Sequence, residues 1–120
     1  MKALVLGFLL SFITCNASCS GANQKQRTLA VALTSVDAAR DSFITWDAAH
    51  QSDIVGTVSS YEEGVSRLTA YRGKRDEIVA GFELAYQAIA AAALGREDIT
   101  VENVIERVRW LQAALDDLMR

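Results

Sequence analysis

Apolar side chains recur every three or four residues from about Gln24 onward, which is the spacing of one face of an α-helix. In the first such stretch, residues 24–51, charged residues flank a single apolar stripe. The stripe consists of Leu29, Ala32, Leu33, Val36, Ala39, Phe43 and Trp46. The polar run Gln51–Asp53 and the pair Gly56-Thr57 predict an interruption after it. We therefore expect a first helix over residues 24–51.

A second helix is predicted to begin at Ser59 or Ser60. Each serine is followed three residues later by a glutamate, Glu62 or Glu63, and this spacing is typical of a capping box at a helix N-terminus. The apolar positions that follow are Tyr61, Val65, Leu68, Val79, Phe82, Tyr86, Ile89 and Ala93. Gly95 suits the C-terminal end of this helix, because glycine readily adopts the left-handed backbone found there.

The third predicted helix begins after Thr100, a natural N-cap, and runs to about Met119. Glu102 lies in its first turn, where a negative charge is favourable to the helix dipole. Its apolar face comprises Val101, Val104, Ile105, Val108, Leu111, Leu115 and Leu118. No sustained alternation of apolar and polar residues indicates a strand.

Together the three helices predict an all-α fold over residues 22–120: a long antiparallel helical hairpin with a third helix along it, a three-helix bundle. If the first two helices turn at residues 53–58, Leu33 faces Val79 and Phe43 faces Leu68 or Thr69. The same register sets Arg75 opposite Asp37, and Arg72 near Arg40 and Asp41. We interpret these charges as an ion pair that sets the register of the helices rather than as an active site.

Composition narrows the class of protein. The chain has 120 residues, of which 51% are hydrophobic, and it has no proline, which suits long uninterrupted helices in a single domain. With 12 Lys and Arg against 15 Asp and Glu, its formal charge is −3. It lacks the basic face that binding to nucleic acid needs, so we expect no nucleic-acid partner.

The first 21 residues have the order of an export signal. The short positive start Met1-Lys2 is followed by an uncharged apolar run, Ala3–Ile13, and then by the small and polar residues 14–21. This order predicts a secretory signal peptide, and the run is shorter than the roughly 20 residues that a permanent transmembrane helix needs.

Both cysteines of the chain, Cys15 and Cys19, lie at the end of this segment. The segment resembles the lipoprotein signal peptides of bacteria, in which a cysteine just after the apolar run becomes the lipidated first residue of the mature chain. Cys15 has the expected distance from the run, whereas Cys19 has the better local neighbours, Ala17 and Ser18. The resemblance implies a membrane anchor. With Asn16 or Ser20 as the next residue, it implies the periplasmic face of the outer membrane.

Two alternatives to lipidation of Cys15 or Cys19 remain open. One is ordinary cleavage after a small residue such as Ala17 or Gly21, which would give a protein soluble in the periplasm. The other is a disulfide between the two cysteines.

The candidate chemistry is sparse. His50, the only histidine, is expected at the end of the first helix near Trp46, Asp47 and Asp53, where the negative end of the helix dipole explains it. One histidine and two aspartates are too few for a zinc site, and the mature chain has no thiol nucleophile. We therefore predict no catalytic residue, no metal and no cofactor, and we do not expect an enzyme.

We expect a small exported, lipid-anchored bacterial or phage envelope protein that acts as a helical interaction or structural module. Its partners would be the membrane and an unknown envelope protein, and the helices could also self-associate. The residues singled out for interaction are Trp46, His50, Tyr61, Arg72 and Arg75. The first three are expected at one end of the hairpin, and the two arginines lie in the basic stretch 71–75.

Two alternative functions stay open. One is a soluble periplasmic ligand-binding or inhibitor bundle, in which Trp46, His50 and Tyr61 line the ligand site. The other is a phage lysis accessory lipoprotein. It is similar to the outer-membrane partners of spanin pairs in length and export, although those are typically rich in proline.

Overall fold

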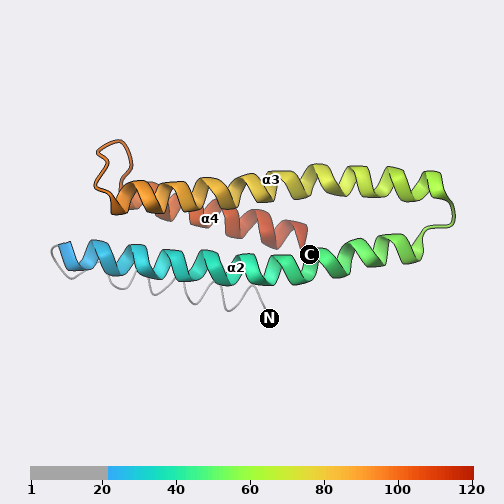
Figure 1. Cartoon of the computed structure of the whole chain (residues 1–120), viewed down its shortest axis with the longest axis horizontal. Helices are drawn as coiled ribbons and strands as arrows, with labels where there is room; N and C mark the ends of the chain where they lie inside the picture. Colours follow the sequence, from blue (N-terminus) through green and yellow to red (C-terminus); the bar gives the residue numbers. More distant parts are fainter. Residues whose placement is uncertain (1–21) are drawn as a thin grey trace.

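The structure, a computed structural model, describes residues 22–120. Three α-helices make up this part of the chain: α2 (Ala22–Thr57), α3 (Tyr61–Ala93) and α4 (Val101–Leu118). α2 and α3 form a long antiparallel hairpin, and α4 lies along the half of it that is remote from the α2–α3 turn (Figure 1). The predicted all-α three-helix fold is confirmed. The predictions for residues 1–21, including Cys15 and Cys19, lie outside the described residues.

The helix ends lie where local side chains satisfy free backbone groups. Ser60 is the N-cap of α3, since its side chain accepts from the backbone N–H of Glu63. The Glu63 carboxylate in turn accepts from the backbone N–H and hydroxyl of Ser59, so both predicted serines take part. After α3, Gly95 adopts a φ of +75°, which only glycine does without strain.

α4 begins with a reciprocal capping box. The Thr100 hydroxyl accepts from the backbone N–H of Asn103, and the Asn103 side chain accepts from the backbone N–H of Thr100. The N-cap at Thr100 was predicted, but the role of Asn103 was not.

The first helix is longer than expected. α2 continues through the predicted interruption and ends only at Thr57, so residues 58–60 alone form the turn. A Cβ at Gly56 would meet no atom within 4 Å. Ile54, which is 4% exposed, packs inside the hairpin. Burial of Ile54 on a continuous helix outweighs the modest cost of one glycine near a helix end.

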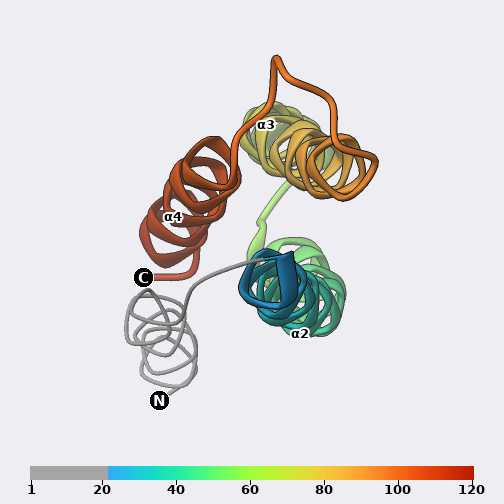
Figure 2. The ribbon, with the colours of Figure 1, turned by 90° about the vertical axis from the view of Figure 1, so that its left-hand side faces the viewer.

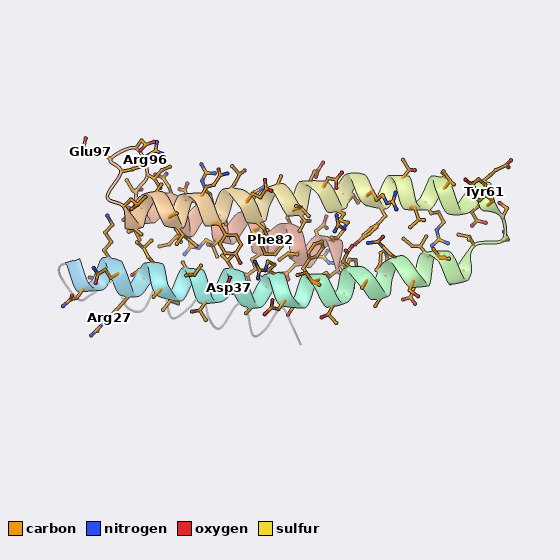
Figure 3. All side chains as sticks on the ribbon, viewed as in Figure 1. Arg27, Asp37, Tyr61, Phe82, Arg96 and Glu97 are labelled. Carbon is orange, nitrogen blue, oxygen red and sulfur yellow. The ribbon has the colours of Figure 1, made fainter. Side chains whose placement is uncertain are left out.

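The longer α2 makes the expected register wrong. Phe43 lies against Phe82, with ring centroids 5.9 Å apart, instead of against Leu68. Phe82 points between α2 and α3 (Figure 3). Arg75 pairs with Asp47, ten residues further along α2 than the expected Asp37. The register follows from the position of the turn, which lies closer to α3 than the sequence pattern indicated.

One core runs through all three helices where α4 is present. Each side chain of this core is less than 10% exposed. The core consists of Leu29, Ala32, Val36, Ala39, Phe43, Ile78, Phe82, Ala85, Ala88, Ile89, Ala92, Val104, Val108, Leu111 and Leu115. The alanines of α3 let α4 approach closely. Four residues expected in the stripes are exposed instead: Leu33 at 40%, Val65 at 46%, Tyr61 at 85%, and Ala93.

Seen along the hairpin, α4 lies on one side of the α2–α3 pair (Figure 2). Within the described residues, the opposite face of the hairpin therefore has no third helix over it. Within residues 22–120, no helix is both long and apolar enough to cross a membrane.

Candidate functional site

A buried carboxylate, Asp47, lies at the centre of the most polar part of the hairpin interior. It is 7% exposed and accepts three hydrogen bonds. The Tyr71 hydroxyl and the Gln51 amide donate to Oδ1, the latter over 3.1 Å. The Arg75 Nε donates to Oδ2 over 3.0 Å. The carboxylate is thus fully partnered by side chains from both long helices.

These contacts shift the pKa values of Asp47 and Tyr71. Burial disfavours the charged form of Asp47, but the hydrogen bonds from Tyr71, Arg75 and Gln51 outweigh it and hold the pKa of Asp47 below its ordinary value. Burial, together with the hydrogen bond to Asp47, raises the pKa of the Tyr71 hydroxyl. At neutral pH Asp47 is therefore an anion and Tyr71 a neutral hydrogen-bond donor.

Three rings pack beside this carboxylate. Trp46 and His50, one turn apart on α2, are stacked with centroids 4.5 Å apart and planes inclined by 11°. Tyr71 from α3 tilts against His50 at 4.7 Å. His50 was expected at the end of the first helix. It lies instead two turns inside α2, because α2 runs on to Thr57.

A cavity of about 280 Å³ opens next to these rings, where α4 ends and the hairpin continues alone. It is lined by His50, Ile54, Arg67, Ala70, Tyr71, Lys74 and Leu118. The lining holds two cations and an imidazole but no carboxylate, so it favours an anionic group. The C-terminal end of α4 lies at this cavity, and its free carbonyls carry the negative end of a helix dipole, which the cations also complement.

A second polar pair crosses the hairpin near its other end. The Tyr86 hydroxyl donates to Asp37 Oδ1, and the Arg40 guanidinium lies 5.8 Å from the centre of the Tyr86 ring. Burial and the nearby Asp37 raise the pKa of Tyr86 to about 12. Asp37, the expected partner of Arg75, is thus held by Tyr86.

The structure brings together only part of the set singled out from the sequence. Trp46, His50 and Arg75 meet around Asp47. Tyr61 lies at the α2–α3 turn, away from them (Figure 3), and Arg72 is exposed on α3.

The two residues at the heart of the cluster, Asp47 and Tyr71, were not singled out for interaction. Asp47 falls at a position that shares the apolar face of α2, and a carboxylate at a core position usually has a partner. That signal was present in the sequence, but its partner could be named only once the register was known.

No cluster of three or more His, Cys, Asp or Glu side chains suited to a metal occurs within residues 22–120. Every buried side-chain nitrogen and oxygen in that range has a hydrogen-bond partner.

No protein-family model matches this chain, and no curated protein and no solved structure is detectably similar to it.

Proposed function

We propose that this chain is a small exported, lipid-anchored envelope protein of a bacterium or phage, without catalytic activity of its own, that acts as a helical interaction module. The anchor would be a lipid on Cys15 or Cys19, at the periplasmic face of the outer membrane. The order of features in residues 1–21 supports export, and their resemblance to lipoprotein signal peptides supports the anchor.

The unequal lengths of the three helices support the role as an interaction module. α2 and α3 have 36 and 33 residues, whereas α4 has 18. One helix half as long as its neighbours covers only part of one hairpin face. Large apolar side chains remain exposed over the rest, among them Ile44 at 56%, Val55 at 61% and Val65 at 46%. A hairpin with such an uncovered face suits the docking of a partner.

The anchor is tested by the intact mass of the N-terminus of protein taken from the membrane fraction of expressing cells. We expect a diacylglycerol-bearing fragment that disappears in either Cys15→Ala or Cys19→Ala, with the other variant as the matched control. An unmodified N-terminus near Ser18 or Ala22, in a protein recovered from the soluble fraction, would contradict the anchor.

The cavity beside His50 favours a second candidate, a soluble periplasmic bundle that binds a small anionic ligand. Its lining combines Arg67 and Lys74 with the apolar side chains of Ile54 and Leu118. A panel of small aromatic and aliphatic carboxylates, titrated while the His50 ring is followed by NMR, tests it. Saturable shifts that are lost in Lys74→Glu but kept in Lys25→Glu would support this function, and unchanged ring signals would exclude it for that class of ligand.

A further inference from the structure

The hairpin face opposite α4 has a groove at one end and projecting side chains at the other. The groove has a volume of about 470 Å³ and is lined only by α2 and α3 residues: Lys25, Gln26, Leu29, Ala30, Leu33, Ile89 and Ala93. At the other end of the hairpin, near the turn, Val55, Tyr61 and Val65 are 61%, 85% and 46% exposed.

The exposed side chains of this face point away from α4. On α3, Gly81 contacts Trp110 of α4, and Val65, sixteen residues earlier, lies roughly 160° around the helix from it. On α2, His50 borders the cavity shared with Leu118 of α4, and Ile44, six residues earlier, lies roughly 120° around from it. This face is the one turned toward the viewer in Figure 1, with α4 behind.

The exposed residues of α2 are spaced symmetrically. Leu33, Ile44 and Val55 are separated by eleven residues each, very nearly three helical turns, so they form one straight row centred on Ile44. A two-fold axis through Ile44 would set Leu33 against Val55 of a second, antiparallel copy.

Four apolar residues of α3, two exposed near the turn and two in the lining of the groove, have the same property about position 77. Val65 and Ile89 lie twelve residues to either side of it, and Tyr61 and Ala93 lie sixteen. An axis at that level would set Val65 against Ile89 of the second copy and Tyr61 against Ala93. The projecting end of each copy would then enter the groove of the other.

One axis satisfies both helices, because residues 44 and 77 lie at the same level of the hairpin. His50 touches Tyr71, and these residues are six positions beyond 44 and six before 77. Asp47 binds Arg75; Asp47 lies three positions after residue 44, and Arg75 lies two positions before residue 77. The contacts inside one chain thus fix the relation that the symmetric pairing requires.

The charges agree with the same pairing. Arg72 and Glu83 are exposed and lie eleven residues apart on α3, in line with Tyr61. Within residues 22–120 neither forms an ion pair. The axis near position 77 brings Arg72 of one copy next to Glu83 of the other, twice per dimer.

We infer that two copies of this chain pair antiparallel through the hairpin face opposite α4, about a two-fold axis that passes between their Ile44 side chains. The pairing is isologous, so every contact occurs twice. It rests on the interaction role proposed above but not on the lipid anchor.

Sedimentation equilibrium of the protein as expressing cells produce it, in a density-matched detergent, tests this pairing. We expect a dimer for the unchanged chain. Ile44→Lys places two ammonium groups together at the axis and should raise the dissociation constant about 100-fold or more. The matched control, Leu84→Lys, changes a side chain of similar exposure, 48%, outside the paired face and should change it less than about threefold.

A charge exchange tests the direction of pairing. Arg72→Glu and Glu83→Arg should each weaken the dimer about fivefold or more, and the double variant should restore it to within about twofold. A dimer that responds equally to Ile44→Lys and Leu84→Lys, or a double variant without recovery, would overturn the pairing.

A monomeric protein, and the state of its N-terminus, also decide between the proposals. A monomer overturns the pairing, and if it binds phosphatidylethanolamine–phosphatidylglycerol vesicles and loses that binding in Ile44→Lys, the face belongs to the membrane. A monomer with a lipidated N-terminus overturns the pairing alone, whereas a dimer with an unmodified N-terminus overturns the anchor alone.

Discussion

Asp47 on α2 and Arg75 on α3 form an ion pair across the hairpin, with Nε 3.0 Å from Oδ2. The carboxylate is nearly buried, whereas the Arg75 side chain is 36% exposed, so the pair lies at the edge of the core. Tyr71 holds the second carboxylate oxygen. A slip of α2 against α3 by one turn would take Tyr71 and Arg75 away from the buried Asp47 and leave it only the Gln51 amide, so these contacts specify the register more than they add net stability.

Removal of the Asp47 carboxylate should therefore destabilise the fold. Asp47→Ala leaves the buried Tyr71 hydroxyl without its acceptor, and we expect the free energy of unfolding to fall by about 2 kcal/mol. The partly exposed Arg75 regains water and limits the loss. Urea denaturation measures it, with the exposed Asp53→Ala on the same helix as the control, expected within about 0.5 kcal/mol of the unchanged chain. Equal midpoints for the two variants would contradict a central role for Asp47.

The Asp47 carboxylate makes the free energy of unfolding depend on pH. Its pKa in the folded chain lies below the ordinary 3.8, so the unfolded chain binds more protons between the two values and stability rises with pH there. The contribution is complete above the unfolded pKa and is lost as the pH falls through the folded one. We expect the difference in unfolding free energy between the unchanged chain and Asp47→Asn to shrink on acidification below 3.8. A difference that is constant with pH would show that the charge of Asp47 does not matter.

Tyr86 gives the opposite dependence at alkaline pH. Burial and Asp37 raise its pKa from 10.0 to about 12, so its contribution to stability is present below 10.0 and is lost as the pH rises toward about 12. Tyrosinate absorbance of the unchanged chain minus that of Tyr86→Phe isolates this group. Asp37→Asn should lower its pKa part of the way toward 10.0, and the control Asp53→Asn should not. An unaltered titration in Asp37→Asn would contradict the hydrogen bond.

Two glycines inside α3 should respond oppositely to alanine. A Cβ at Gly81 would lie 2.5 Å from Cζ3 of Trp110, whereas a Cβ at Gly73 would meet nothing within 4 Å. Gly73→Ala should stabilise the protein by up to about 1 kcal/mol through helix propensity. Gly81→Ala should be less stable than Gly73→Ala by about 1–3 kcal/mol, because α3 and Trp110 must move apart. Thermal unfolding of the two variants decides this, and equal stabilities would mean that the Trp110 ring yields freely.

Local chemistry explains what could be predicted without the structure. Ser60 and Thr100 cap helices because their hydroxyls accept backbone N–H groups a few residues away, and Gly95 ends α3 because it tolerates a positive φ. The apolar stripe of α4 was also correct, since Val104, Val108, Leu111 and Leu115 are all buried. Each of these features depends on residues within one or two helical turns.

Features that join distant residues could not be predicted in the same way. The polar residues after Gln51 indicated a break, but the helix continued because Ile54 gained burial against α3. That extension moved the turn, and with it the partner of Arg75, the surroundings of His50 and the side of the hairpin on which Leu33 and Val65 lie.

The sequence by itself thus determined that the chain forms three helices and where α3 and α4 begin, because the free energy of those features comes from neighbours along the chain. Only the tertiary structure decided the register, the Asp47 cluster and the face left uncovered by α4. Those follow from how whole helices share one core, where a shift of a few residues at a single turn changes every contact across the hairpin.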